Sequence, residues 1–353
     1  MSLTVALAIL AGVVLLGVVV HGAWTTRRAG PRQPQVVDNA EPAHRLEPTL
    51  GGVDPAPATI DGEPVVGLPD PVRTAVATRR AARIDALIDA IATVAPETPI
   101  SGELALQHLP TTRRAGSKPF HIEGLDSETG DWEQPQAGHR YTEFQAAVQL
   151  ANRHGALNEI EYSEFVQKVQ AFADAVGAMP DFPDMLDAVA RARELDAFSS
   201  AHDAQLTAVL RANSVAWSVG YLQQCAGRHG FVPGVVPGRL VLPSTEEGAP
   251  PVLVLAFDHQ AALAEDPGEA ALREVTLSLD VPQTPEAAEP FSAWQEQARR
   301  LADDLDATLV DDQGQPITLH AFAAIGAELL RLYRALESRD LAAGSLAARR
   351  LFS

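Results

Sequence analysis

The residue types that support catalysis are present in this chain, but they are scattered along it. Ten histidines and a single cysteine, Cys225, occur in the 353 residues, and none lies in a His-Glu-x-x-His or Cys/His metal-binding spacing. The glycine motifs that bind phosphate and the Gly-x-Ser-x-Gly turn of serine hydrolases do not occur either. We therefore expect no catalytic residue, no cofactor, no metal site and no small-molecule substrate.

Two short charged segments could bind ions, but each has a simpler explanation. Residues 311–314, Asp-Asp-Gln-Gly, lack the alternating aspartates and the distal glutamate of an EF-hand, so a polar turn after a strand explains them better. Residues 113–118, Arg-Arg-Ala-Gly-Ser-Lys, could hold an anion, although one basic patch in an acidic chain indicates a solvated loop. We interpret Cys225 as a small buried residue of a helix, since a lone cysteine cannot form an internal disulfide.

The charge balance argues against nucleic acid as a partner. The chain has 46 acidic and 27 basic residues, which gives a net charge of −19, and Lys118 and Lys168 are its only lysines. Binding to phosphate backbones needs clustered Lys and Arg side chains. We therefore expect the partners to be a protein and a membrane.

A membrane anchor is the clearest feature of the N-terminus, and we assign it to residues 1–23. Eighteen apolar residues without a charge form a helix of roughly 27 Å, just long enough to cross a bilayer core. Arginines follow this span and no basic residue precedes it, so the N-terminus is predicted outside and the rest of the chain in the cytoplasm. A cleaved signal peptide is the alternative, but its basic start and small-residue cleavage site are missing. The residues that mark the span and its interface are Leu3, Val20, Trp24, Arg27 and Arg28.

A linker separates this anchor from the folded part. Residues 24–75 begin with a basic juxtamembrane segment and then carry nine prolines with no helical or strand periodicity, which predicts a disordered, semi-stiff tether. The remainder is longer than one small core needs, so we divide it into a first unit over 76–200 and a second over 201–342. Residues 343–353 form a tail without a strong pattern.

Alternating hydrophobicity and helix caps predict the elements of the first unit. Residues 165–174 fit either a strand or a helix, because periodicity does not decide between them. The other predictions are strands at 83–92 (with a helix as the alternative), 118–124 and 141–151, and helices at 101–109 and 182–195.

The second unit has the clearest strand of the chain. Val275, Leu277, Leu279 and Val281 alternate with polar residues, as expected of a strand with one buried face. The full set comprises strands at 205–211, 238–243, 252–257, 274–281 and 308–310, and helices at 214–228, 291–305 and 319–337.

The two units repeat the same order of strands and helices. A short echo accompanies this repeat, since residues 192–197 read Ala-Arg-Glu-Leu-Asp-Ala and residues 302–307 read Ala-Asp-Asp-Leu-Asp-Ala, each predicted to end a long helix. We therefore expect an α+β fold built from a duplicated unit, in which an antiparallel sheet is covered by helices on one face. A single domain with a long insertion is the alternative.

The order of anchor, juxtamembrane segment 21–28 and proline-rich tether resembles the ZipA family of bacterial division proteins. Four soluble segments also resemble parts of that family's C-terminal domain. Residues 101–106 resemble its first helix and residues 148–152 its third strand. Residues 275–282 resemble its fourth strand, and residues 301–313 the end of its second helix and its fifth strand. The resemblance implies binding of the C-terminal tail of FtsZ, which tethers the division ring to the cytoplasmic face of the inner membrane. It also implies two tandem ZipA-like units and a protein without catalytic activity.

The family binds the FtsZ tail in an apolar cleft on the helix-free face of its sheet. In the second unit, the resemblance places this cleft at Val209, Val252, Val254, Ala256, Thr276 and Ser278. In the first unit, the corresponding positions are Ala147, Ala151 and Arg153. The family has a bulky aromatic residue at the position of Ser278, so this chain departs from the pattern there.

We expect a single-pass protein at the division site, with its N-terminus in the periplasm. Which unit binds FtsZ, how tightly it binds, and the oligomeric state stay open. Two alternatives also stay open: a membrane-anchored scaffold of another envelope complex with a different peptide partner, and a receptor or enzyme tethered in the periplasm.

Overall fold

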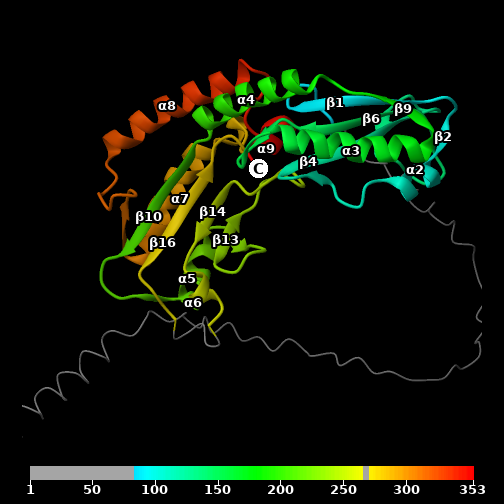
Figure 1. Cartoon of the computed structure of the whole chain (residues 1–353). Coiled ribbons are helices and arrows are strands. Elements are labelled where there is room, and N and C mark those ends of the chain that lie inside the picture. Colours follow the sequence, from blue (N-terminus) through cyan, green and yellow to red (C-terminus); the bar gives the residue numbers. More distant parts are fainter. Residues whose placement is uncertain (1–82, 265–269) are drawn as a thin grey trace, which may run out of the picture. The chain divides into compact units, whose positions relative to one another are not determined.

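The computed structural model describes residues 83–264 and 270–353 (Figure 1). The predicted anchor and linker therefore lie outside the described residues. Within the described ranges, no helix has both the length and the hydropathy that a membrane span requires.

The first sheet is antiparallel and is covered by α3 (Glu159–Val176) on one face (Figure 1). Its strand order is β3-β4-β6-β1-β9, with β2 pairing with β6 and β5 with β4. The remaining elements of this part are β1 (Asp89–Pro96), β2 (Ile100–Ser101), α2 (Gly102–His108), β3 (Arg114–Ala115), β4 (Lys118–Asp126), β5 (Trp132–Glu133), β6 (Arg140–Gln149), β7 (Ala151–Asn152), β8 (Gly155–Ala156), β9 (Ala178–Asp181) and α4 (Met185–His202).

The second sheet is also antiparallel, in the order β12-β13-β14-β16-β10-β17, and α7 (Pro290–Leu305) contacts β10, β16 and β17. Its other elements are β10 (Gln205–Ala212), β11 (Trp217–Ser218), α5 (Val219–Arg228), β12 (Val232–Pro233), β13 (Arg239–Leu242), β14 (Leu253–Ala256), α6 (His259–Ala262), β15 (Ala271–Leu272), β16 (Glu274–Asp280), β17 (Ala307–Val310), α8 (Leu319–Glu337) and α9 (Leu346–Leu351). These elements confirm an α+β fold with antiparallel sheets.

The two sheets share one topology. The order β4-β6-β1-β9 in the first sheet corresponds to β14-β16-β10-β17 in the second, and the helices follow the same strands in the chain. The registers agree as well, because Val94 on β1 lies opposite both Phe144 and Pro180, while Leu210 on β10 lies opposite Val275 and Leu309. Strand order and register therefore correspond between the two sheets.

The topology also shows which segment corresponds to the repeated sequence at 302–307. Residues 192–197 lie inside α4, which continues to His202, so the prediction that they end a helix is wrong. The counterpart of α7 is α3, and the two helices end alike: residues 172–178 read Phe-Ala-Asp-Ala-Val-Gly-Ala and residues 301–307 read Leu-Ala-Asp-Asp-Leu-Asp-Ala. Each helix stops at a residue in the left-handed conformation, Gly177 (φ 66°) or Asp306 (φ 51°), and the next strand begins at once.

Most predicted elements are confirmed, and α8 has the predicted bounds. The undecided segment 165–174 is helical, since Phe165, Val169, Phe172 and Val176 form one buried face. Asn158 caps the start of that helix with a capping box, in which Glu161 takes part.

Three further predictions need correction. The strand predicted at 83–92 starts only at Asp89, because Asp85 forms a turn that accepts the backbone N–H groups of Ile88 and Asp89. The helix predicted from residue 214 starts at Val219, after Ser218 caps it. The tail predicted without a pattern contains α9.

The end of the chain packs into the core of the first sheet. Ala348, Leu351 and Phe352 are buried there, and the side-chain amide of Gln149 donates to the carbonyl oxygen of Arg350 over 2.8 Å. The guanidinium of Arg350 binds both carboxylate oxygens of the buried Asp89, at 2.5 and 2.9 Å. The C-terminus therefore completes a core that lies more than 150 residues earlier in the chain.

Candidate peptide-binding faces of the two sheets

Each sheet has a core face under its helices and an opposite face without them. Side chains alternate between these faces, so every second residue of a strand belongs to the helix-free face. In the second sheet, Ala208, Leu210, Leu255 and Leu277 are buried in the core with the α7 side chains Trp294, Ala298 and Leu301. The residues between them form the helix-free face.

Two cross-strand rows of small and apolar side chains cross the helix-free face of the second sheet. We call these rows the strip. One row is Val241, Val254, Ser278 and Thr207. The next row is Ala256, Thr276, Val209 and Val310, of which Val310 is buried. Five residues predicted for the cleft, Val209, Val254, Ala256, Thr276 and Ser278, lie in the strip, and each is partly exposed.

Two predicted cleft positions depart from the expected geometry. Ser278 donates its hydroxyl to the carbonyl oxygen of Val254 over 3.3 Å, so the strip is flat where the ZipA family has an aromatic side chain. Val252 precedes β14 and packs against the second core, and its N–H donates to Leu242. Val252 is therefore not part of the strip.

Ion pairs bound the strip at both ends of β16. At one end, Arg153 lies 2.7 Å from Asp280 and 2.6 Å from Asp203, and these pairs raise the pKa of its guanidinium against the effect of burial. At the other end, Arg211 lies 2.7 Å from Glu274. An extended segment that lies across the strip would therefore meet paired charges on either side of its apolar contacts.

The helix-free face of the first sheet has different chemistry at the same positions. The row that corresponds to Val254 and Ser278 is His121 and Ala147, and the row that corresponds to Ala256 and Thr276 is Glu123 and Gln145. Thr93 and Asp181 continue the second row where the strip has Val209 and Val310.

Polar contacts close the part of this first face around Glu123, whereas Thr93 and Asp181 are exposed. The backbone N–H of Arg83 donates to Glu123 over 2.6 Å, and Gln145 donates to the same carboxylate over 3.1 Å. Arg350 also donates to the carbonyl oxygen of Arg83. Burial, together with the charges of Arg350, Arg83 and Arg113, lowers the pKa of His121 to about 4.

The three residues predicted for a first-unit cleft do not share an accessible surface. Ala147 lies on the helix-free face at the position of Ser278, but it is buried. Ala151 lies in β7 and is buried in the first core. Arg153 is held by its two ion pairs next to the second sheet. The open apolar strip therefore belongs to the second sheet.

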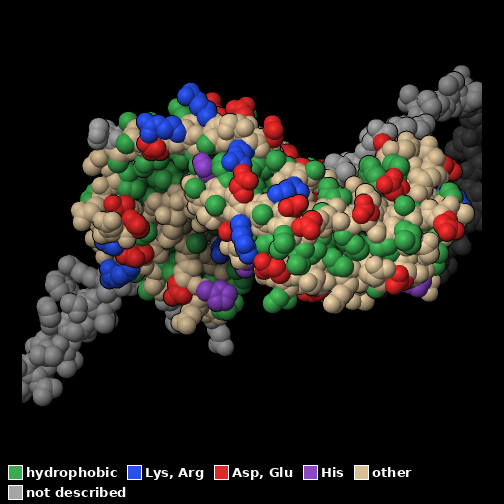
Figure 2. Space-filling view, turned by 45° about the horizontal axis from the view of Figure 1, so that its top comes forward, with side chains coloured by type: hydrophobic (Ala, Val, Ile, Leu, Met, Phe, Trp, Pro, Cys, Tyr) green, Lys and Arg blue, Asp and Glu red, His purple; other side chains and the backbone are tan. Residues whose placement is uncertain are grey.

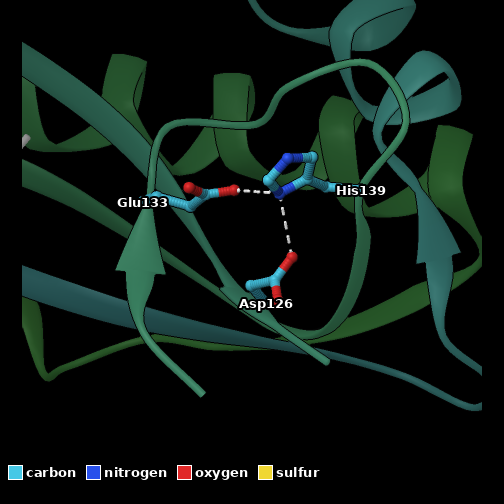
Figure 3. A group of neighbouring side chains, drawn as sticks. All are labelled: Asp126, Glu133 and His139. Atoms are coloured by element: carbon cyan, nitrogen blue, oxygen red, sulfur yellow. Dashed lines mark hydrogen bonds and ion pairs between the residues drawn. The ribbon is translucent and has the colours of Figure 1, made fainter. Parts of the chain in front are cut away.

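A compact group of titratable side chains that the sequence did not predict lies at the end of β4 (Figure 3). The Nδ1 atom of His139 is 3.0 Å from Asp126 and 2.8 Å from Glu133. The Tyr141 hydroxyl donates to Glu133 over 2.7 Å, and the backbone N–H groups of Thr129 and Glu128 lower the pKa of Asp126. One ring nitrogen faces both carboxylates, so an N–H at Nδ1 donates to them without a metal ion. No sequence motif joins the three residues, which come from separate segments.

Several basic side chains of the described surface are paired with acidic ones. Over the face in Figure 2, basic side chains lie singly or in small groups among acidic and apolar ones. Arg300 with Glu296 and Arg331 with Glu328 are examples on helices. This pattern gives no support to a nucleic-acid partner, which needs a continuous basic surface.

Comparison with known proteins connects the second sheet with one family. No curated protein matches the chain. The matching family model covers α6, β15, β16, α7, β17 and the first half of α8. Of the strands that carry the strip, it therefore includes β16 and β17. It also includes two of the four soluble segments on which the resemblance is based, 275–282 and 301–313. The family resemblance is confirmed for residues 259–328, which match the family model described as ZipA, C-terminal FtsZ-binding domain.

Proposed function

We propose that this protein binds the C-terminal tail of FtsZ on the strip of the second sheet and tethers the FtsZ ring during cell division. The observation that carries the proposal is the match of residues 259–328 to an FtsZ-binding domain, because Thr276 and Ser278 of the strip lie inside the matched segment. The matched family is not catalytic, so docking alone performs the function.

Docking would use the apolar side chains of the strip. Val209, Val254 and Ala256 offer contacts to apolar residues of a peptide, while Thr276 and Thr207 offer hydroxyl groups for hydrogen bonds. Side chains of this size bury little area, so we expect modest affinity at a single site. Many tails along one FtsZ polymer, facing many tethers on one membrane, would compensate by raising the effective concentration.

We place the binding site in the second of two tandem ZipA-like units. The shared strand order and register support a duplication, and only the second sheet combines the family match with an open apolar strip among the described residues. In this proposal the first unit keeps the fold, while its face has become polar and closed.

The membrane tether rests on the sequence. The uncharged span from Leu3 to Val20, the flanking Arg27 and Arg28, and the linker to residue 75 support a single-pass inner-membrane protein with a cytoplasmic C-terminal part at the division site. Deleting residues 1–28 should release the protein from the membrane fraction. Recovery of the shortened protein with membranes would contradict the anchor. A reporter fused after the exposed Ser353 distinguishes this orientation from a periplasmic receptor or enzyme.

Fluorescence anisotropy of a labelled FtsZ C-terminal peptide with the detergent-purified full chain tests the partner. We expect saturable binding, and we expect its affinity to fall at least about tenfold in Ala256→Glu. This change introduces into the strip the residue type of the corresponding first-face position, Glu123. Thr142→Glu is the matched control, because Thr142 is an exposed strand residue of the first sheet. If no variant and no wild-type protein binds at high micromolar concentration, FtsZ is excluded and a scaffold with another peptide partner becomes the better explanation.

A further inference from the structure

The middle of β4 lacks a strand neighbour on its outer side. In the second sheet, the corresponding strand β14 pairs along its length with β13, from Arg239 opposite Ala256 to Leu242 opposite Leu253. In the first sheet, β3 pairs only with the start of β4 and β5 only with its end. Residues 120–123 therefore have β6 on one side and, among the described residues, no strand on the other. This gap is about 13 Å long at 3.3 Å per residue.

Backbone groups of β4 point into this gap. The N–H of Phe120 donates outward, to the carbonyl oxygen of Arg113 over 3.0 Å. Donors alternate along an antiparallel strand, so the N–H and C=O groups of Ile122 point to the same outer side. Gly124, the next residue with this orientation, is already opposite Glu133 of β5. Ile122 thus offers one donor and one acceptor to an added strand.

A cavity of about 330 Å³ adjoins this edge. Phe120, His121 and Ile122 of β4 line it, together with Leu106 and Leu109 from the α2 segment and Gln134 beyond β5. Its volume lies at the lower end of the range of ligand sites. An apolar side chain of a bound segment could contact the two leucines while its backbone pairs with Ile122. We call the edge and the cavity together the β4 notch.

The notch has a positive charge that nothing in the described structure neutralises. Arg113 lines the cavity and is exposed, and its guanidinium has no hydrogen-bond or ion-pair partner among the described residues. Lys118 of the same basic segment is buried and bound to Asn152, and Arg114 donates to Ser117, so neither competes with Arg113 for a ligand. In a chain of net charge −19, an unpaired arginine at a cavity favours an acidic ligand.

We propose that the β4 notch binds a short, extended, acidic peptide segment of a partner protein, which adds as a strand beside Ile122 and pairs a carboxylate with Arg113. This is strand addition at an exposed sheet edge, in which main-chain hydrogen bonds provide affinity and side-chain pockets provide specificity. The proposal is independent of FtsZ binding, because the notch lies on the first sheet and the strip on the second.

Isothermal titration of the full chain with a hexapeptide of alternating Glu and Val residues tests this proposal. We expect saturable binding, a loss of at least about tenfold in Arg113→Glu, and no binding of the hexapeptide in which Lys replaces Glu. Arg299→Glu is the matched control, because Arg299 is exposed on α7 and the charge change is the same. Leu106→Glu, at a partly exposed wall position, should also weaken binding.

Two further readouts make the test specific to the strand edge. Amide hydrogen exchange should slow at Ile122 when the acidic peptide binds, and saturating FtsZ tail peptide should not displace it. If the acidic hexapeptide shows no saturable binding up to roughly 1 mM, the proposal is overturned. Equal losses in Arg113→Glu and Arg299→Glu, unchanged exchange at Ile122, or displacement by the FtsZ peptide would each overturn it as well.

Discussion

The helix-free faces of the two sheets differ far more than the sheets themselves. Strand order and register coincide, yet His121, Glu123 and Asp181 on the first face stand where Val254, Ala256 and Val310 stand on the second. The core faces of both sheets remain apolar, because any polar or oversized side chain there would disturb close packing. The two sheets thus keep one topology through their cores, while the helix-free face is an open apolar strip in one and a largely polar surface in the other.

Closure of the first face depends on Arg350, and breaking it should have the largest effect on stability. Arg350→Ala leaves the carboxylate of Asp89, which is 1% exposed, without its cation, and such a loss costs about 3–5 kcal/mol. Urea unfolding should show this decrease in the free energy of unfolding. Arg331→Ala removes a pair in which both side chains are about 70% exposed and should cost less than about 1 kcal/mol. Similar losses in both variants would contradict a special role for Arg350.

Exchanging the residues at the equivalent core positions Ala146 and Leu277 should destabilise the protein in both directions, for opposite reasons. Both are fully buried on the middle strand of their sheets, but Ala146 is surrounded by a core with Phe144, Phe165 and Phe172. Leu277→Ala would leave a cavity in the second core and cost about 2–5 kcal/mol. Ala146→Leu would overpack the first core and cost about 1–3 kcal/mol. Denaturant midpoints of both variants check this. An unchanged midpoint in Leu277→Ala would contradict the expected cavity, and an unchanged midpoint in Ala146→Leu would contradict the expected overpacking.

The sequence predicts elements whose signals are local, and it does so well here. The alternation from Val275 to Val281 predicts both the strand β16 and its buried face, and the apolar spacing predicts α8. It does not predict α9, because six residues are too few for a period and their burial depends on a core near residue 90. The start of β1 was misplaced because the turn at Asp85 depends on its hydrogen bonds.

The site could be predicted only in part, for the same reason. Alternation identifies which residues share a face, so five of the six second-unit residues fall in the strip. Alternation does not indicate which distant segments cover that face in the folded protein. Ala147 is predicted as a cleft residue and lies at the position of Ser278, but the closure that buries its surroundings comes from Arg83 and from Arg350 at the far end of the chain.

Acid should destabilise the closed first face through His121. Its pKa in the folded protein is about 4, below the ordinary value of 6.5, so the unfolded chain takes up the proton first as the pH falls. Stability from this residue is therefore complete above about pH 6.5 and is lost as the pH falls towards 4, by at most about 1.4 kcal/mol per pH unit. Urea unfolding between pH 7 and pH 4 should show this slope, and His121→Gln should reduce it. The corresponding residue of the second face, Val254, does not titrate and contributes no such slope. An unchanged slope of stability against pH in His121→Gln would assign the effect to other groups.

The smallest effect, and the one closest to function, concerns the aromatic residue that the strip lacks. Ser278→Phe would add an aromatic surface between the partly exposed Val254 and the exposed Thr207. One further aromatic contact is worth about 1 kcal/mol, so affinity for the FtsZ tail peptide should rise about fivefold in anisotropy measurements. Ala147→Phe is the same change at the corresponding position of the first sheet, where the site is buried. It should lower stability without raising affinity, because the polar closure leaves no room for the ring. Tighter binding in Ala147→Phe would place a tail-binding face on the first sheet, and unchanged binding in Ser278→Phe would move the tail away from the strip.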